Sequence, residues 1–322
     1  CLSYFDMRTL IKHLLAATEP ADSVLIQGWV RTRRDAKGFS FIEVNDGSSL
    51  AGIQVIADEG IPGYENMHKL NTGASVTVKG RLVASQGGKQ KWEVQATEVR
   101  LLGEAPDDYP LQKKGHTPEF LRSIGHLRPR TNLYGAMFRI RSRMSQAVHR
   151  FFAERDFHYI HTPIITGSDC EGAGEMFRVT TLDPTSGAKQ SFEDDFFGRA
   201  AHLTVSGQLE GEAFACALGR IYTFGPTFRA ENSHTSRHAS EFWMIEPEMA
   251  FCDLEGDMDL AEEMVKYLVV EALEKQDGDL SIFERFVDKG LRERLEFVAS
   301  NDFERISYTE AVEILGKSGE QF

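Results

Sequence analysis

TFGPTFRAENSHTSRHASEFWMIEPEMAF, residues 223–251, is the stretch that decides the fold of the second half of this chain. In its first part, Arg229 and Glu231 stand two residues apart on a predicted strand, so their side chains point the same way. Small polar residues from Asn232 to Ser236 then predict a loop. A second predicted strand begins near Glu241, runs through Phe242, Trp243, Met244 and Ile245, and ends in Glu246 and Glu248. The stretch therefore predicts a β-hairpin that directs an arginine, an aromatic face and carboxylates toward one cavity.

This combination of side chains favours a nucleotide ligand. An arginine fork matches phosphate oxygens in a bidentate way, and an aromatic ring on the partner strand offers a stacking surface for a purine. The alternative is an amphipathic hairpin whose charges only face water. A metal pair formed by His234 and His238 is a weaker alternative, because helical spacing has no meaning in a polar loop. We expect no metal site within these residues.

Composition indicates a globular protein of about two domains. The chain has 322 residues, of which 41% are hydrophobic, and a net charge of −13, which argues against a protein coated with positive charge for DNA. A local basic stripe could still bind RNA, and it consists of Arg31, Arg33, Arg34 and Lys37, interrupted by Asp35. The four scattered cysteines suggest neither a zinc ribbon nor a disulfide framework. Without a run of about 18 apolar residues we expect no membrane span and a cytoplasmic location.

Residues 21–103 have the pattern of a small all-β domain. Five strand-like segments, VLIQGWV, FSFIEVND, AGIQVIAD, SVTVKGRLVAS and KWEVQATEVRLL, are separated by Gly, Asn, Asp and Ser turns. We predict a closed five-stranded OB-fold barrel, with a purely structural β module as the alternative. The interleaved Arg33, Arg34, Phe39 and Phe41 favour RNA, because single-stranded bases stack on aromatic rings while arginines hold phosphates.

The rest of the chain predicts an α+β domain on an antiparallel sheet, residues 131–322, after a proline-rich linker, residues 104–130. Helices are predicted over Tyr134–Ala153 and Leu254–Lys275, the second with an apolar stripe, and HYIHTPIIT is predicted as a strand that carries Pro163. The stripe consists of Ala261, Met264, Val265, Leu268 and Ala272. Residues 1–20 read as an extension, in which we expect Met7 to be the natural start and the first six residues to be non-native.

The hairpin resembles motif 2 of the class II aminoacyl-tRNA synthetases, and FRAENSHTSRHASEFWMIEPE is similar to the asparaginyl members of the aspartyl, asparaginyl and lysyl subgroup. The resemblance implies an ATP site in which Arg229 binds the α-phosphate and stabilises the transition state. It assigns Glu231 to the nucleotide and amino-acid side, Arg237 and His238 to the phosphates, and Phe242 to stacking on adenine. Magnesium accompanies ATP in this family.

The resemblance also implies an amino-acid pocket. Glu171, in the glycine-rich loop SDCEGAGEMF, is similar to a glutamate that meets the substrate's α-ammonium, and Ser206 and Gln208 lie in HLTVSGQLEGE, which resembles the pocket strand. Glu246 and Glu248 are assigned to the substrate's ammonium or amide. Aspartyl enzymes carry a lysine where this chain has Gly211, and loss of that cation favours asparagine over aspartate. A glycine that merely ends a strand is the alternative.

The implied reaction is ATP-dependent ligation of L-asparagine to its tRNA through asparaginyl-adenylate. Arg34, Phe41 and Gln54 resemble family positions that grip the tRNA anticodon, and Pro163 resembles the motif 1 proline at a homodimer interface. Two alternatives remain, an aspartyl-type or non-discriminating synthetase and a non-catalytic tRNA-binding paralogue. Motif 3, with its second arginine for ATP, does not occur in the sequence. We therefore expect a truncated catalytic domain that is inactive as given.

Overall fold

The computed structural model describes residues 8–88, 90–112, 114–170, 172, 175–183, 185, 191–233, 235 and 238–319. The chain divides into two compact units. The first unit draws on residues 1–143 and 271–297, and the second on residues 144–270 and 298–322. Glu171, His234 and Arg237, which the sequence analysis assigned to the site or considered for it, lie outside the described residues.

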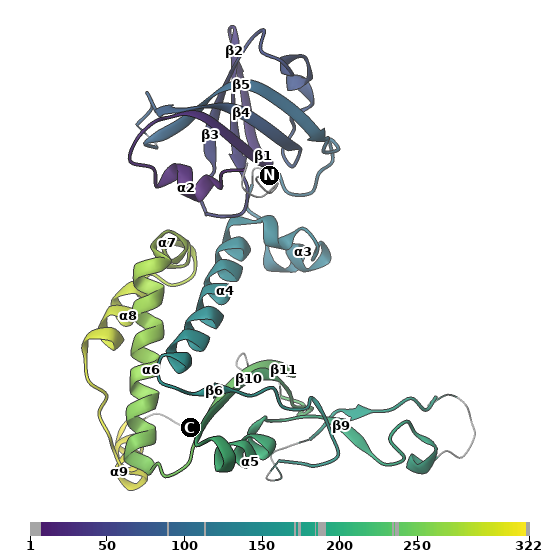
Figure 1. The fold of residues 1–322 in the computed structure, drawn as a ribbon, viewed down its shortest axis with the longest axis vertical. Coiled ribbons are helices and arrows are strands. Elements are labelled where there is room, and N and C mark those ends of the chain that lie inside the picture. The colour runs from purple at the N-terminus through teal and green to yellow at the C-terminus, as the bar shows by residue number, and fades with distance from the viewer. Residues whose placement is uncertain are drawn as a thin grey trace. The chain divides into compact units, whose positions relative to one another are not determined.

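The first unit contains a closed five-stranded barrel (Figure 1). Its strands are β1 Ala21–Ala36, β2 Phe39–Asn45, β3 Ile53–Asp58, β4 Ser75–Ala84 and β5 Trp92–Gly103. They are ordered β1-β2-β3-β5-β4 around the barrel, and β3 pairs with β5 in parallel while the other pairs are antiparallel. The five-stranded barrel predicted from the sequence is confirmed.

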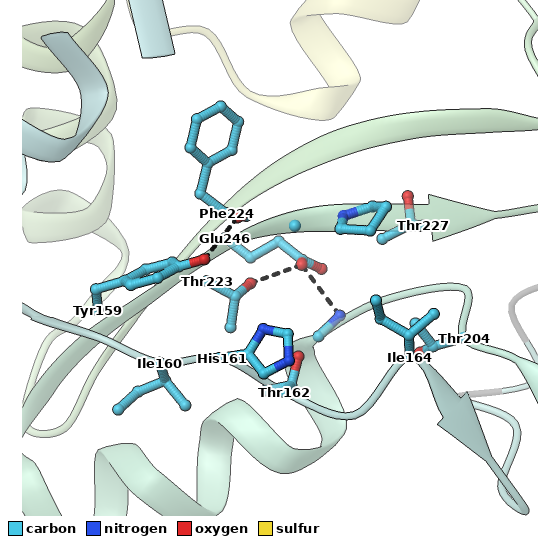
Figure 2. Close-up of a pocket in the computed structure, with 13 residues that line it drawn as sticks. Tyr159, Ile160, His161, Thr162, Ile164, Thr204, Thr223, Phe224, Thr227 and Glu246 are labelled. Carbon is cyan, nitrogen blue, oxygen red and sulfur yellow. Dashed lines mark hydrogen bonds between the residues drawn. The ribbon is translucent and has the colours of Figure 1, made fainter. Parts of the chain in front are cut away.

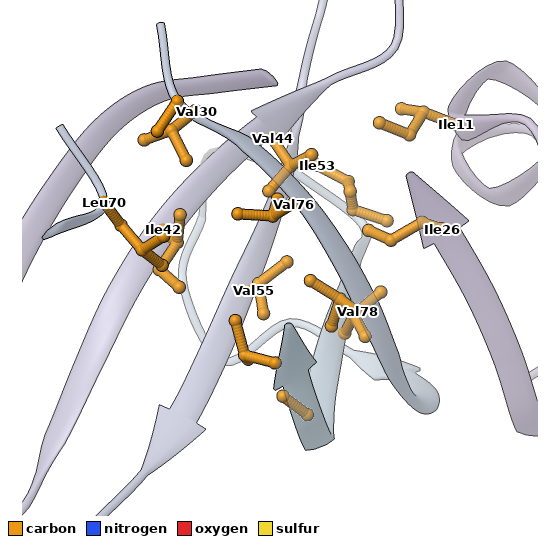
Figure 3. Packing of buried hydrophobic residues seen from close by; sticks show 14 of the residues in the cluster. Ile11, Ile26, Val30, Ile42, Val44, Ile53, Val55, Leu70, Val76 and Val78 are labelled. Atoms are coloured by element: carbon orange, nitrogen blue, oxygen red, sulfur yellow. The ribbon is translucent and has the colours of Figure 1, made fainter. Parts of the chain in front are cut away.

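Alternation along these strands fills the barrel. In β3, Ile53, Val55 and Ala57 are fully buried, while the residues between them face outward. Branched side chains from the other strands and Ile11 of the short helix α2, Ile11–Leu15, complete the apolar core (Figure 3). The 3-10 helix η1, Tyr64–Lys69, adds Met67 to it. The outward face of β1, β2 and β3 is thus left for other contacts.

The predicted linker contains short helices, which the proline count did not reveal. Helix α3, Pro118–Ser123, begins after Thr117, whose hydroxyl accepts a hydrogen bond from the Phe120 N–H, and a 3-10 helix η2, Arg128–Arg130, follows. Helix α4 runs from Asn132 to Ala153, and helices α7 Asp277–Phe286 and α8 Leu291–Ser300 come late in the chain. Arg139 of α4 makes a bidentate ion pair with the buried Asp279 of α7 at 2.6 and 2.9 Å.

The second unit is built on two small sheets. Strands β11 Glu241–Met249, β10 Arg220–Phe228 and β6 His158–Tyr159 form the first, and β7 Ile165–Thr166, β9 Ala201–Leu203 and β8 Arg178–Val179 form the second. The β10 and β11 pair is antiparallel, as predicted, whereas β6 joins β10 in parallel. The remaining elements are the 3-10 helix η3 Phe192–Asp194 and helices α5 Gln208–Leu218, α6 Leu254–Lys275 and α9 Tyr308–Lys317.

An aromatic core covers one face of the β10 and β11 pair. It comprises Val148, Phe151, Phe152, Phe157, Tyr222 and Phe224, and residues of β11 and α6 pack against it. Tyr222 stacks on Phe152 with ring centroids 4.3 Å apart. The predicted stripe of α6 is partly wrong, because Ala261 and Val265 are exposed and Leu260 and Tyr267 pack on the core instead. None of the helices in the described ranges is long and apolar enough to cross a membrane.

Candidate functional site

The two faces of the predicted hairpin have different roles. Strands β10 and β11 pair with Thr223 opposite Glu246 and Thr227 opposite Phe242. Because side chains alternate along a strand, Tyr222 and Phe224 enter the aromatic core. Thr223, between these two residues, therefore lies on the opposite face, together with Phe242 and Glu246. This face carries the candidate site.

Arg229 sits at the end of β10, beside the aromatic ring predicted for it. Its guanidinium carbon lies 5.6 Å from the ring centroid of Phe242, and its backbone N–H donates to the Ser240 carbonyl at 3.1 Å. The Nε atom of Arg229 is buried and has no hydrogen-bond partner among the described residues. An unpartnered buried donor costs free energy unless a ligand binds it. Arg229 thus offers a buried hydrogen-bond donor that has no partner among the described residues.

The predicted strand geometry around Arg229 is wrong in one respect. Strand β10 ends at Phe228, so Arg229 and Glu231 do not alternate on a continuous strand. After Arg229 the chain separates from β11, because the Ala230 N–H donates to the carbonyl of Glu175 at 2.8 Å instead. Glu231 is exposed, and so is His238, whose Nδ1 is hydrogen bonded to the Thr235 hydroxyl. Among the described residues, no three His, Cys, Asp or Glu side chains gather as metal ligands.

Glu246 is the centre of a small pocket (Figure 2). Its carboxylate accepts hydrogen bonds from the Ser206 hydroxyl, from the Gly207 N–H at 3.1 Å and from the Thr223 hydroxyl at 2.8 Å. The Tyr159 hydroxyl, on the other side of the pocket, donates to the Phe224 carbonyl at 3.1 Å. A carboxylate has about four lone-pair sites, so acceptor capacity remains for one more donor.

The turn that leads to Gln208 differs from the predicted strand. Strand β9 ends at Leu203, and Gln208 is the first residue of helix α5. Its backbone N–H donates to the Ser206 hydroxyl at 3.0 Å, and its side-chain amide donates to Glu212, four residues on, at 3.0 Å. Apolar and small residues spaced along QLEGEAFACAL favour a helix, and that helical period was missed in the sequence.

Gly211 lies within α5 and does not end a strand. It is buried, and a Cβ atom there would lie 3.5 Å from Ile221 and 3.7 Å from Glu248, both ordinary contact distances. Helix α5 therefore packs on the face of the hairpin that carries Glu246 and Glu248. The two glutamates share this face, as predicted from their spacing.

The strand predicted around Pro163 is interrupted. HYIHTPIIT forms two short strands, β6 and β7, and Pro163 is exposed between them, which agrees with the inability of proline to donate to a ladder. Tyr159 of β6 is half exposed, and it contributes to the raised pKa of the buried Tyr222 hydroxyl, after burial itself. Sequence analysis missed Tyr159, Thr223 and Gly207, which carry no motif of their own.

The barrel brings the three predicted anticodon residues onto one face. Arg34 of β1 pairs directly with Phe41 of β2, and its guanidinium lies 5.4 Å from the ring centroid. Gln54 lies on the next strand, opposite Glu43. Arg34 is exposed and Phe41 and Gln54 are half-buried, and such a row of polar and aromatic side chains suits a single-stranded nucleic acid.

The predicted basic stripe divides into two parts. Arg31 and Arg33 donate to the backbone carbonyls of Arg130 and Met67, and burial lowers the pKa of Arg31. Arg34 and Lys37 are exposed. Only the second part is therefore available to a partner on this surface.

Two family models match the chain. Residues 118–322 match "tRNA synthetases class II (D, K and N)", and residues 24–102 match "OB-fold nucleic acid binding domain". The chain is 60% identical over 320 residues to an asparagine--tRNA ligase of Nitratidesulfovibrio vulgaris and 55% identical over 320 residues to one of Alkaliphilus oremlandii. These alignments cover 98% and 97% of the chain and 69% of each relative.

The solved structures that are similar to this chain include asparaginyl-tRNA synthetases. The crystal structure of asparaginyl-tRNA synthetase from Pyrococcus horikoshii complexed with asparaginyl-adenylate is similar with a TM-score of 0.78 and 26% identity. The similarity covers 94% of this chain and 65% of that one, so the chain spans slightly less than two thirds of its length. The asparaginyl-tRNA synthetase of Entamoeba histolytica, at 22% identity and a TM-score of 0.75, shares the fold.

Proposed function

Since the chain belongs to the class II tRNA synthetases of the D, K and N group, we propose that it serves in the ATP-dependent ligation of L-asparagine to its tRNA. Membership of this class implies the use of ATP. The single observation that carries the proposal is Arg229, whose buried Nε has no partner among the described residues and whose guanidinium lies over the ring of Phe242. An adenine stacked on Phe242 would bring its phosphates toward that donor.

The first step is attack of the asparagine carboxylate on the α-phosphorus of ATP. A carboxylate oxygen to phosphorus bond forms, the bond from phosphorus to the bridging oxygen breaks, and pyrophosphate leaves. No general base is needed, because the carboxylate is already ionised at pH 7. Arg229 then acts by positioning and by stabilising the charge that develops on the phosphoryl oxygens.

In the second step a hydroxyl of the terminal ribose of the tRNA attacks the acyl carbon of asparaginyl-adenylate. AMP leaves with the mixed-anhydride oxygen, and the amino acid is esterified to the tRNA. The outward row of Arg34, Phe41 and Gln54 on the barrel is proposed to bind the anticodon of the same tRNA. The stacking position of Phe41 and the charge of Arg34 support this assignment.

Magnesium is proposed to enter with ATP. No group of three metal-ligating side chains is found among the described residues, and the steps above are written for the protein's own groups. Mg²⁺ commonly relies on substrate phosphates and water for most of its ligands.

Asparagine rather than aspartate is supported by the contact between helix α5 and the hairpin. Gly211 places no side chain between α5 and the hairpin, and the carboxylates of Glu246 and Glu248 lie on the adjoining face. A carboxylate accepts a hydrogen bond from an amide NH2 but repels a second carboxylate. Ser206 and Gln208 are proposed to contact the backbone atoms of the amino acid.

The test is ATP/pyrophosphate exchange by the full-length gene product that carries this chain, with asparagine and aspartate compared at equal concentration. We expect exchange with asparagine and little with aspartate. Gly211→Lys should lower asparagine-dependent exchange, whereas Gly316→Lys, at an open and exposed position within helix α9, serves as the matched control. Equal exchange with both amino acids would favour a non-discriminating synthetase, and none with either would favour a non-catalytic tRNA-binding protein.

A homodimer in the cytoplasm is also proposed. Pro163 is exposed, and the neighbouring Tyr159 and Ile165 are 47% and 45% exposed, which is typical of a surface that another subunit covers. Light scattering on the full-length protein, with and without Ile165→Lys, tests the dimer. Cell fractionation tests the location.

A further inference from the structure

A cavity of the first unit is lined by three arginines, Arg31, Arg130 and Arg139. Its volume is about 170 Å³, far more than the roughly 10–15 Å³ that one water molecule needs. No Asp or Glu is found among its lining residues in the described part of the chain. The chain as a whole has 49 acidic residues against 36 lysines and arginines. Within an acidic protein, this cavity therefore favours negative charge.

Contacts on three sides hold two of these arginines in place. Arg31 of β1 donates to the backbone carbonyl of Arg130 at 2.6 Å. Arg130 of η2 donates in turn to the Tyr109 hydroxyl at 3.1 Å, and its guanidinium carbon lies 5.3 Å from the ring centroid of Trp29. Because both side chains are already ordered, a ligand that binds them costs little further side-chain entropy.

Most hydrogen-bond donors of Arg31 and Arg130 remain available for a ligand. A guanidinium has five N–H donors, and within the described ranges each of these two side chains uses one of them. Neither forms an ion pair with a described carboxylate. Arg139 differs, because it is paired with Asp279 and also donates to the Gly47 carbonyl at 3.3 Å. Arg31 and Arg130 thus carry the spare donors of the cavity.

The positive charges around the cavity oppose one another. Burial lowers the pKa of the Arg31 guanidinium, and the charges of Arg139 and Arg130 lower it further, while Glu43 and Tyr109 act in the opposite direction. A bound anion offsets both the loss of hydration and the repulsion between like charges. The electrostatics of the cavity therefore favour the same ligand as its donors do.

We propose that this cavity binds a phosphate-sized oxyanion, either free phosphate or the phosphate group of a small molecule, through Arg31 and Arg130. Guanidinium groups match phosphate oxygens in a bidentate way. Thr131 and Asn132, at the beginning of α4, also line the cavity, and the positive end of a helix dipole favours an anion. None of the residues that we assign to ATP, asparagine or the anticodon takes part, so this site is independent of the proposed function.

The walls of the cavity favour a small ligand over an RNA strand. They come from β1, from the loops before β3 and β4, from the linker and from the start of α4. A phosphodiester group within RNA needs an open path for the strand on both sides, whereas a free oxyanion needs none. The bound oxyanion joins Arg31 of the barrel to Arg130 of the linker.

The experiment measures binding of inorganic phosphate to this chain by titration calorimetry, at an ionic strength that chloride keeps constant. We expect saturable binding to the wild type. Arg31→Gln should weaken it by roughly 10- to 100-fold, the range for loss of a hydrogen bond to a charged group. Arg33→Gln is the matched control, because Arg33 lies on the same strand, also donates to a backbone carbonyl and is not among the lining residues. It should bind phosphate as the wild type does.

Asn132→Asp tests the site without removing an arginine. Asn132 is exposed, and the substitution places a carboxylate at the cavity that repels an oxyanion. An acidic residue in the first turn of a helix is favourable, so the variant is expected to fold with an unchanged or higher melting temperature. Phosphate binding should nevertheless fall as it does in Arg31→Gln.

Arg229→Ala distinguishes this cavity from the proposed ATP site. If Arg229→Ala loses phosphate binding while Arg31→Gln and Asn132→Asp keep it, the ion binds in the second unit and the inference is wrong. Equal losses in Arg31→Gln and Arg33→Gln would show a response to surface charge alone and would also overturn it. The same holds if the wild type shows no saturable binding, even where Arg31→Gln weakens binding of a stem-loop RNA, because the arginines then serve an RNA backbone.

Discussion

The carboxylate of Glu246 on β11 accepts a hydrogen bond from the backbone N–H of Gly207, 39 residues earlier in the chain, at 3.1 Å. Gly207 immediately precedes helix α5, so its N–H is one of the groups that a helix leaves without an internal partner. The negative charge of Glu246 lies where the positive end of the helix dipole favours it. Through this contact β11 fixes the turn that presents Ser206 and Gln208.

The fit around Gly207 leads to a first prediction. A Cβ atom at this position would approach the hydroxyl oxygens of Thr223 and Thr162 to 2.8 and 2.9 Å. Gly207→Ala should therefore destabilise the folded protein by about 1–3 kcal/mol, the usual cost of overpacking. Gly225→Ala in the adjacent strand β10 is the control, because a Cβ atom there meets nothing within 4 Å. Urea denaturation of both variants measures the difference in the free energy of unfolding. Equal stabilities would show that the turn shifts to accommodate the added methyl group at little cost in free energy.

Asp195 gives a prediction about pH. Its buried carboxylate is hydrogen bonded to the Thr180 side chain, to the Thr181 N–H at 2.9 Å and to the Phe196 N–H at 2.8 Å, which together lower its pKa. A lowered folded-state pKa adds stability above the unfolded carboxyl pKa of about 3.9, and that stability is lost as the pH falls through the folded value. Asp195→Asn should thus be less stable than wild type at pH 7.

The difference in stability between wild type and Asp195→Asn should narrow below about pH 4, because the wild type there begins to lose the stability that its charged carboxylate adds. Thermal melts at neutral and acidic pH measure it, and the exposed neighbour Glu193→Gln serves as control. A gap that stays constant down to the acid limit would mean that Asp195 stabilises by shape and not by charge.

The sequence predicted those features that local patterns control. Helix α6 begins and ends at the predicted Leu254 and Lys275. The alternating segments correctly predicted the barrel. The start of α5 was missed because a short apolar run fits a strand or a helix equally well. Gln208 was therefore placed on a strand.

Long-range contacts could not be read from the sequence. Arg31 and Arg33 donate hydrogen bonds to backbone carbonyls 99 and 34 residues away. The hydrogen bonds that Glu246 accepts from Gly207 and Thr223 likewise join residues that are 39 and 23 positions apart. Such pairs leave no periodic signal, so no pattern in the chain predicted the residues that position Glu246.

Phe41 leads to a prediction about RNA affinity. Its ring stands between Arg34 and Phe39 on the outward face of the barrel, with the Phe39 ring centroid 5.0 Å away. Phe41→Ala should weaken binding of the anticodon stem-loop by about 1–3 kcal/mol, the worth of one stacked base. Phe120→Ala, which truncates an exposed phenylalanine of α3 outside the barrel, should have little effect. Unchanged affinity of Phe41→Ala at fixed salt would remove this ring from the binding surface.

Arg229 leads to the last prediction, which concerns rate more than binding. In the proposed function its charge meets the negative charge that develops during adenylate formation, so Arg229→Ala in the full-length protein should slow that step by on the order of 10²–10³. Asparagine binding should change far less. Single-turnover adenylate formation measures the rate, and Arg220→Ala, at the exposed far end of β10, is the matched control.

Arg229→Lys separates two accounts of how this side chain acts. A lysine keeps the charge but cannot reproduce the bidentate fork or the flat contact with Phe242, so we expect a poor rescue of the rate. A lysine variant with a nearly normal rate would show that Arg229 supplies only general positive charge. An alanine variant with a nearly normal rate would remove Arg229 from the reaction, and its buried Nε would then need another partner.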